Sequence, residues 1–240
     1  MTATGEIQIA VMISAHAEWD CAISYYKNPT VVSTPAGAYF NRELANRRVL
    51  FFHAGWGKVA SAAAAQYIID HWSPALIINL GTCGGFAGEV EVGDIILPNE
   101  TLIYDIYERM GDPKSALDHY RTRLDLSFLC LPFPRDVRIT RLISADQDID
   151  PDLVIKLKEE YEAVAADWES GTIAWVAQHN RTDCLILRVV SDLVDGMGGE
   201  LYNQGSFTDR TREVFTPLLM TLPNWIRCAR WGRENETPDL

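Results

Sequence analysis

Residues 47–85 read RRVLFFHAGWGKVASAAAAQYIIDHWSPALIINLGTCGG, and the succession of patterns within them predicts the class of fold. The apolar run at 47–54 indicates a strand, residues 59–72 have the length and alanine content of a helix, and residues 74–82 indicate a second strand. Strands and helices that alternate in this way are typical of a largely parallel sheet with helices on both faces. We therefore expect an α/β fold.

The alternation continues on both sides of this unit. The apolar patterns predict further strands at 7–14, 92–98, 138–146 and 183–192, a hairpin around 34–40, and helices at 156–164, from 166 onwards and at 208–231. Pro217 and Pro223 should interrupt the last helix, because proline removes a backbone donor. Residues 107–135 are the least regular part of the chain.

The length and continuity of the chain indicate one domain. Its 240 residues suit a single large α/β domain and contain neither an internal repeat nor a low-complexity linker. We predict one domain over 1–240, a three-layer αβα arrangement around a central mixed, largely parallel sheet. Residues 1–5 and 233–240 should be flexible ends.

Composition and charge argue against several classes of function. The net charge of −12 disfavours a nucleic acid partner, since binding to phosphates requires a basic face. Five cysteines without a CxxC spacing indicate neither a disulfide framework nor a zinc site. The apolar run at 7–15 follows Glu6 and no basic residue, so it indicates a strand and not a signal peptide. No segment approaches the ~20 apolar residues of a membrane span. We expect a cytoplasmic protein with no membrane partner.

A glycine motif opens the predicted helix at 59–72. Residues 55–60, GWGKVA, fit the GxGxxA pattern of dinucleotide-binding proteins. That pattern requires an acidic residue after the next strand, about 20 residues on, to bind the ribose of the cofactor. The next strand, ALIINLGT, carries none. The motif is therefore weak evidence for a nicotinamide cofactor, and we expect none.

The stretch ADWESGTIAWV at 166–176 places Asp167 and Glu169 on either side of Trp168 where a helix should begin. One interpretation is capping, because acidic residues in the first turn interact favourably with the helix dipole. The other is that these carboxylates bind a ligand. The stretch alone leaves both interpretations open.

Polar side chains recur where the predicted strands end, at the edge where ligands bind in doubly wound sheets. Each of them alone could be a cap or a strand terminator. Several carboxylates without paired histidines or metal-ligand spacing favour acid–base chemistry over metal binding, so we expect no metal. The residues that this edge could gather are Glu18, Thr82, Glu169, Ser191 and Asp192.

Four stretches in order carry a resemblance to a known family. They are HAGWGKVASAAAA, ALIINLGTCGGFAGEVEVGDIILP, ADWESGTIAWVA and CLILRVVSDLVD. Together they resemble the nucleoside phosphorylase superfamily, and within it most of all the methylthioadenosine/S-adenosylhomocysteine nucleosidases. The resemblance covers roughly residues 7–105 and 142–195, and it implies a nucleoside phosphorylase-like fold and a homodimer.

The resemblance also implies roles for individual residues in cleaving a purine nucleoside. Asp192 would protonate the purine at N7, and Glu18 would deprotonate the attacking water. Glu169 would accept hydrogen bonds from the ribose hydroxyls, and Trp168 would lie against the sugar. The other expected substrate contacts are Thr82, Cys83, Gly84, Ser191, Phe207, Ile149, Trp56 and Ala15.

The chain departs from the family pattern at several of these positions. Asp148, beside Ile149, stands where the family has an aromatic residue that stacks on adenine. Trp56 and Ala15 replace a small aliphatic residue and a methionine near the expected place of the 5′ group, which indicates a reshaped 5′ pocket. No phosphate-binding arginine is evident, because residues 79–80 are Asn-Leu and Arg188 lies within a strand. We predict a hydrolase; a phosphorylase, a nicotinamide-dependent oxidoreductase and a catalytically silent binding protein are the alternatives.

Overall fold

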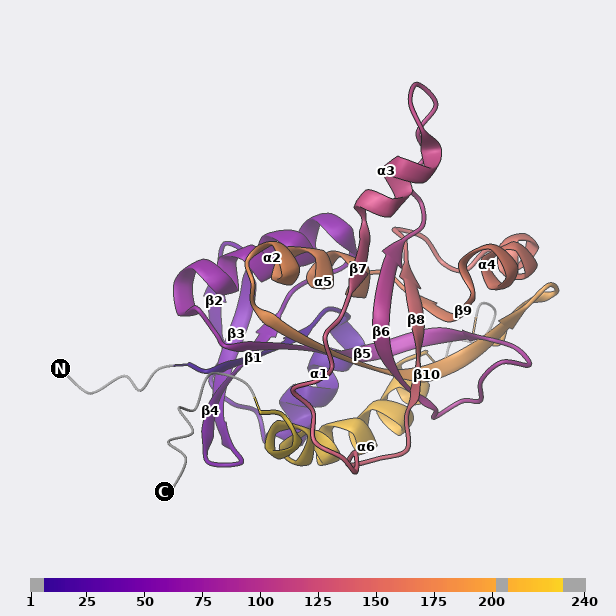
Figure 1. Ribbon diagram of the computed structural model, residues 1–240. Coiled ribbons are helices and arrows are strands. Elements are labelled where there is room, and N and C mark those ends of the chain that lie inside the picture. The colour runs from indigo at the N-terminus through magenta and orange to yellow at the C-terminus, as the bar shows by residue number, and fades with distance from the viewer. Residues whose placement is uncertain (1–6, 202–206, 231–240) are drawn as a thin grey trace, which may run out of the picture.

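The computed structural model describes residues 7–201 and 207–230 (Figure 1). The described strands are β1 (Ile9–Ile13), β2 (Val32–Thr34), β3 (Gly37–Leu44), β4 (Arg47–His53), β5 (Leu76–Phe86), β6 (Ile95–Ile103), β7 (Arg121–Arg123), β8 (Arg138–Ser144), β9 (Ala163–Asp167), β10 (Asp183–Asp195) and β11 (Gly198–Gly199). The described α-helices are α1 (His16–Tyr25), α2 (Gly57–Trp72), α3 (Pro113–His119), α4 (Val154–Tyr161), α5 (Ser170–His179) and α6 (Phe207–Cys228), and a 3₁₀ turn spans Pro151–Leu153.

The strands form one mixed sheet, which confirms the predicted α/β class. β4, β1, β5 and β10 are parallel neighbours: Ile9 pairs with Val49 on one side and Leu76 on the other, and Leu76 also pairs with Asp183. The antiparallel pairs β2–β3 and β3–β4 extend the sheet at one side. The parallel order follows from the strand–helix–strand connections, which place successive strands in the same direction.

At its other side the sheet closes on itself. β5 pairs with β10, β10 with β6, β6 with β8, β8 with β9, and β9 returns to β5, so that these five strands form a ring. β5 and β10 are long enough to belong both to the parallel sheet and to this ring. A bulge between Val190 and Asp192 interrupts the pairing of β10 with β5. It follows Val189, which pairs with Ile95 of β6.

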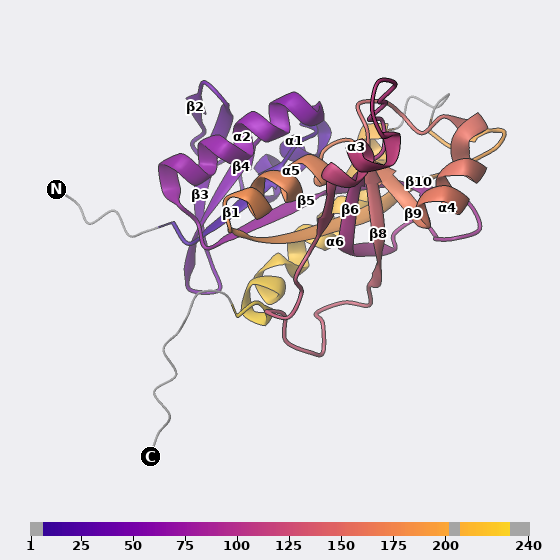
Figure 2. The ribbon, with the colours of Figure 1, turned by 45° about the horizontal axis from the view of Figure 1, so that its top comes forward.

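Helices cover both faces of the sheet (Figure 1): α2 and α5 lie on one face, and α1 and α6 on the other. The alternation of side chains along β1 shows why both faces are apolar. Ile9, Val11 and Ile13 pack into the core under α1 and α6, whereas Ala10 and Met12 pack into the core under α2 and α5. Figure 2 shows α2 and α5 beside one another, and Gln66 of α2 is hydrogen-bonded to Asn180 after α5. The expected three layers are therefore present.

Two predictions about elements are wrong, and one strand is longer than expected. The helix expected at 156–164 ends at Tyr161, because Glu162 adopts a left-handed conformation with φ of 51°, and β9 follows it. β5 runs from Leu76 through the glycine-rich segment to Phe86, so it extends beyond the strand expected at 74–82. α6 runs through Pro217 and Pro223 without interruption. Its buried face, which packs against α1 and the sheet, offsets the hydrogen bonds that the prolines remove.

The remaining differences are smaller. The irregular region expected at 107–135 contains α3 and β7, and β6 begins and ends later than the strand expected at 92–98. The flexible ends expected at 1–5 and 233–240 lie outside the described residues.

Candidate active site

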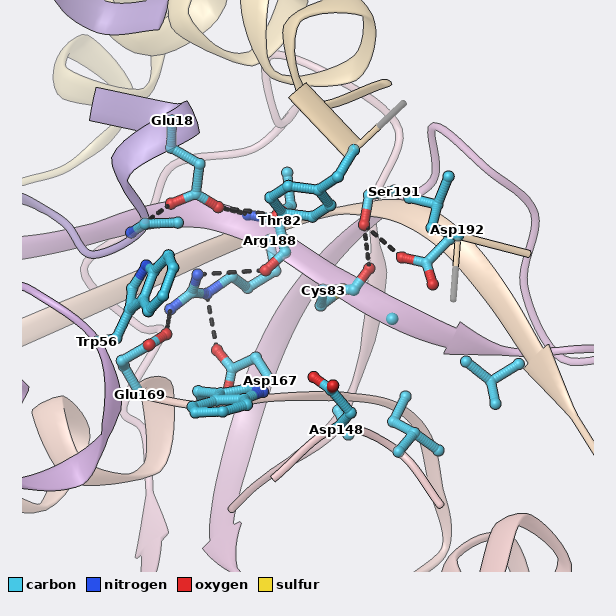
Figure 3. A pocket seen from close by; sticks show the side chains of 18 of the residues that line it. Glu18, Trp56, Thr82, Cys83, Asp148, Asp167, Glu169, Arg188, Ser191 and Asp192 are labelled. Atoms are coloured by element: carbon cyan, nitrogen blue, oxygen red, sulfur yellow. Dashed lines mark hydrogen bonds and ion pairs between the residues drawn. The ribbon is translucent and has the colours of Figure 1, made fainter. Parts of the chain in front are cut away.

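A cavity of about 520 Å³ lies at the ends of β5 and β10 (Figure 3), a volume in the range of small-molecule sites. It brings together every residue that the sequence placed in the site: Ala15, Glu18, Trp56, Thr82, Cys83, Gly84, Ile149, Trp168, Glu169, Ser191, Asp192 and Phe207. The cavity also has lining residues that were not expected there, namely Gln147, Ala166, Asp167, Arg188, Val194 and Leu201, and the departure noted at Asp148 lies in it as well.

Glu18 enters the cavity from the first turn of α1 and is 1% exposed. Its Oε1 accepts hydrogen bonds from the backbone N–H of Thr82 at 2.6 Å and from the Thr82 hydroxyl at 2.8 Å, and its Oε2 accepts one from the Ala15 N–H at 3.3 Å. Burial raises the pKa of Glu18, although Arg188 and these donors act in the opposite direction. Glu18 is thus a buried, tightly oriented carboxyl group that binds protons more strongly than an exposed glutamate.

Arg188 is the centre of the polar network in the cavity, and it is the main residue that sequence reasoning missed. Its guanidinium lies 2.8 Å from Asp167 and 3.6 Å from Glu169, and it donates to Asn79 at 2.8 Å and to the Thr82 carbonyl at 3.2 Å. A buried charge requires such partners, because an isolated one would be very costly. The signal was present in the sequence as a single arginine within the apolar strand LILRVV.

A glycine makes room for this guanidinium. A Cβ atom at Gly81 would lie 2.0 Å from Nη1 of Arg188 and 3.0 Å from Oε1 of Glu18. The glycine-rich end of β5 therefore allows two charged side chains to approach the strand backbone closely.

The two acids around Trp168 have different roles. Asp167 accepts hydrogen bonds at 3.2 Å from the N–H of Ser170, the first residue of α5, so capping belongs to Asp167. Glu169 is the residue before the helix, but its side chain caps nothing in α5. It accepts a hydrogen bond from the N–H of Gly57 at 3.1 Å instead. Burial raises the pKa of Glu169 to about 8, while Arg188 acts in the opposite direction.

The start of α2 is occupied by carboxylates. Gly57, with φ of 80°, donates its N–H to Glu169, and the N–H of Lys58 donates to Asp146 at 2.7 Å. Lys58 also forms an ion pair with Asp105 at 2.5 Å. A helix N-terminus that binds a dinucleotide must offer these N–H groups to a pyrophosphate. In this structure the N–H groups of the GxGxxA segment donate to Glu169 and Asp146.

The bulge in β10 explains how two consecutive residues reach the same cavity. In a regular strand Ser191 and Asp192 would point to opposite faces, but the bulge between Val190 and Asp192 turns both toward the cavity. The Ser191 hydroxyl lies 2.7 Å from Oδ1 of Asp192 and 3.2 Å from the Cys83 carbonyl. Burial raises the pKa of Asp192, and Asp148 and Glu200 act in the same direction, so the protonated form is favoured relative to an ordinary aspartate.

Aromatic side chains lie at the rim. Trp56 is 59% exposed, and its ring lies 5.2 Å from that of His16. His16 in turn lies 3.1 Å from His53, measured between Nδ1 and Nε2. Phe207, the first residue of α6, is 41% exposed. The cavity therefore has a buried, carboxyl-rich interior and a partly open aromatic mouth.

Residues 8–217 match the profile of the phosphorylase superfamily, and the chain belongs to that superfamily. Among curated relatives, the 5′-methylthioadenosine/S-adenosylhomocysteine nucleosidase of Tolumonas auensis is 26% identical over 178 residues, which are 69% of this chain and 77% of that protein.

Solved structures share the fold. The 5′-methylthioadenosine/S-adenosylhomocysteine nucleosidase of Neisseria meningitidis, in complex with methylthio-immucillin-A, aligns with a TM-score of 0.74 at 22% identity, covering 91% of this chain and 98% of that one. The futalosine hydrolase of Helicobacter pylori aligns with the same TM-score at 16% identity, over 91% and 98% of the two chains. Because differently named enzymes align equally well, the fold alone does not identify the substrate.

Proposed function

We propose that this chain hydrolyses the N-glycosidic bond of a purine nucleoside of the 5′-methylthioadenosine/S-adenosylhomocysteine type and releases the free base. The observation that carries the proposal is the presence of Glu18, Glu169 and Asp192 around one cavity (Figure 3). Glycosidic hydrolysis with a single displacement by water requires an acid for the leaving group and a base for the water. Both groups have raised pKa values, as proton transfer near neutral pH requires.

Asp192 is the acid in this mechanism. A purine leaves poorly as an anion, so its N7 must be protonated as the bond between C1′ and N9 breaks. Asp192 donates that proton, and the electron pair of the broken bond remains on the base, which leaves neutral. The Ser191 hydroxyl, 2.7 Å from Oδ1, orients the carboxyl group.

Glu18 is the base and Glu169 binds the sugar. As positive charge develops on the ribose ring, water attacks C1′ and gives its proton to Glu18, whose oxygens are oriented by Thr82 and Ala15. Glu169 accepts hydrogen bonds from the two ribose hydroxyls, while Gly57 holds the carboxyl group in position. The oxygen of the water and its remaining hydrogen become the new hydroxyl group on C1′. After the reaction Asp192 has lost its proton and Glu18 has gained one.

The charge of the cavity supports water as the nucleophile over phosphate. Of the described residues that line the cavity, Arg188 alone is cationic, and Asp167, Glu169 and Asn79 already hold its guanidinium. A phosphate dianion requires cationic partners that are free to bind it. A phosphorylase is therefore the weaker candidate.

We also propose a homodimer in the cytoplasm, with one domain per chain. Exposed apolar side chains near the start of α2 support the dimer: Val59 is 83% exposed and Tyr107 is 77% exposed. The Lys58–Asp105 ion pair joins the two segments that carry them. Of the helices in the described part of the chain, none is long and apolar enough to cross a membrane. Sedimentation of the wild-type protein and of Val59→Glu tests the dimer, which the variant should weaken.

The function is tested by chromatography of the purified protein with methylthioadenosine, S-adenosylhomocysteine, adenosine and inosine, each with and without phosphate. Free base and free sugar without phosphate are expected. Cleavage only with phosphate would instead identify a phosphorylase. Binding without release of base would identify a silent binding protein, and quenching of intrinsic fluorescence by NADH, but not by adenine, would favour an oxidoreductase.

A further inference from the structure

One carboxylate in the cavity has no partner in the described part of the chain. Glu18 accepts from Thr82, Asp167 is paired with Arg188, Glu169 accepts from Gly57, and Asp192 lies against Ser191. Asp148 lines the same cavity, yet within residues 7–201 and 207–230 it accepts no hydrogen bond and forms no ion pair. With five carboxyl groups against the single guanidinium of Arg188, the described lining of the cavity is strongly acidic.

Asp148 lies on the wall that faces the acid. It follows β8, and its side chain points into the cavity, with Cys83, Ser191 and Asp192 on the other side (Figure 3). The main cause of the raised pKa of Asp192 is its burial, and the charge of Asp148 acts in the same direction. Since both side chains line the cavity, a purine bound to Asp192 would face the wall that carries Asp148.

We infer that Asp148 is a specificity-determining residue that favours purine bases carrying positive charge, either permanent or arising when N7 is protonated. This inference rests on the proposed function of the site. Asp148 is exposed to solvent, and a purine bound beside it would displace part of that solvent. The carboxylate would then attract a cationic ring more strongly than a neutral one. An aromatic residue at this position would stack on a neutral ring equally well.

The inference adds N7-substituted purine nucleosides to the substrates that the site accepts, with 7-methylinosine as the probe. Its base already carries the positive charge that Asp192 must otherwise create. When the bond between C1′ and N9 breaks, the electron pair moves to N9 and neutralises the imidazolium ring. Water adds to C1′ and loses its proton to Glu18. Neutral 7-methylhypoxanthine leaves, and no proton from Asp192 is required.

The test compares kcat/KM for 7-methylinosine and inosine in the wild type, Asp148→Asn, Asp148→Glu and Glu159→Gln. Asp148→Asn keeps the shape and removes the charge, so the preference for 7-methylinosine should fall about tenfold or more, which is about 1.4 kcal/mol. Asp148→Glu should restore most of the preference. Glu159 is an exposed acid of α4 outside the cavity lining, and its variant controls for net charge.

Two further measurements separate this role from a structural one. Asp192→Asn should lose activity on inosine and retain it on 7-methylinosine, whereas Asp148→Asn should lower kcat/KM for 7-methylinosine more than kcat/KM for inosine. The pH profile on inosine should also change, because Asp148 faces Asp192 together with Glu200 and Arg210. Without the negative charge of Asp148 the pKa of Asp192 is lower, so Asp192 loses its proton at a lower pH. The decline of activity with rising pH should therefore begin at a lower pH than in the wild type.

The inference is overturned if Asp148→Asn keeps the preference for 7-methylinosine within twofold of the wild type. A wild-type protein that releases no base from any nucleoside would instead contradict the proposed function. In that case equilibrium binding, followed by intrinsic tryptophan fluorescence, still tests the inference, since Trp56 and Trp168 both line the cavity. Wild type should bind 7-methylinosine at least tenfold more tightly than Asp148→Asn does, and equal affinities would overturn it.

Discussion

Nε of Arg188 lies 2.8 Å from Oδ2 of Asp167, and the two side chains are 1% and 2% exposed. Removing the cation leaves Asp167 and Glu169 buried beside each other without a counter-charge. We expect Arg188→Met to lower the free energy of unfolding by about 3–5 kcal/mol at neutral pH, as in other broken buried ion pairs. The loss should shrink in acid, where the carboxylates are protonated.

Urea unfolding of Arg188→Met and Arg188→Lys at several pH values measures this effect. Arg188→Lys is the matched control, because it keeps the charge and loses the planar fork that reaches several partners. A loss below 1 kcal/mol in Arg188→Met, or a loss independent of pH, would contradict the network described around this residue.

Asp192→Asn should fold normally and lose turnover of purine nucleosides with a neutral base, such as adenosine and inosine. General acid catalysis typically contributes about 10²- to 10⁴-fold, and an amide cannot supply the proton. The measurement is the rate of base release, together with thermal unfolding to show that the fold persists. A rate within tenfold of the wild type would exclude Asp192 as the acid.

Glu169→Gln should change the pH dependence of stability. Burial raises the pKa of Glu169 from its ordinary value of 4.5 to about 8, so the folded protein binds this proton more tightly than the unfolded chain does. Stability is therefore present below about pH 4.5 and is lost as the pH rises toward 8. Glu169→Gln has no proton to lose at this position. The difference in free energy of unfolding between Glu169→Gln and the wild type should therefore shift in favour of the variant as the pH rises from about 4.5 to 8.

Thermal unfolding at pH 5 and pH 8.5 checks this sign. Glu159→Gln, which removes an exposed carboxylate from α4, should follow the wild type at both values. If Glu169→Gln also ran parallel to the wild type, the buried carboxyl group would not hold a proton in this range.

Glu169→Gln should also weaken the discrimination of ribose from 2′-deoxyribose. Above its pKa of about 8 Glu169 is ionised, and both of its oxygens can then accept from the ribose hydroxyls, whereas the amide of glutamine has one accepting oxygen, so the comparison is made at pH 9. The ratio of kcat/KM for adenosine and 2′-deoxyadenosine measures the effect. An unchanged ratio would remove Glu169 from sugar binding and leave it with its contact to Gly57.

Gly57→Ala should raise KM and lower stability by about 2 kcal/mol or more. Its φ of 80° is unfavourable for alanine, and the new Cβ would lie 2.8 Å from Asp146, so the start of α2 would move away from Glu169. Gly93→Ala is the control: its φ is 92°, and a Cβ there would meet no atom of the described residues within 4 Å. Gly93→Ala should cost about 1–2 kcal/mol from backbone strain alone and leave KM unchanged.

Much of the fold was predictable from local patterns, and one strand was not. The strand–helix–strand succession at 47–85 is strongly apolar and periodic, and its elements are present with small shifts. β9 was missed because AVAAD is short and rich in alanine, which has low strand propensity. Only its pairing with β5 and β8, which closes the ring, makes this segment a strand.

The residues of the site can likewise be divided into those that the sequence could identify and those that it could not. Glu18 and Asp192 could be selected as strand-end carboxyl groups, since their place depends only on where apolar runs stop. Arg188 and Asp167 could not be assigned, because their role lies in a contact between β10 and the end of β9. The positions of Asp167 and Glu169 suggested one shared role, whereas the structure gives capping to the first and the contact with Gly57 to the second.

The order of residues along the chain was enough to determine the α/β class, the order of the main strands and helices, and the types of side chain at the sheet edge. These follow from periodicity and from where apolar runs end, which are local properties. Tertiary structure decided the closure of the ring, the turn of Ser191 and Asp192 into one cavity, and the pairing of Arg188 with Asp167. Within residues 7–201 and 207–230 it also left Asp148, on the wall opposite Asp192, without a hydrogen bond or an ion pair. Such features depend on long-range strand pairing and on electrostatics in a buried site, where the partner is set by distance in space and not by separation along the chain.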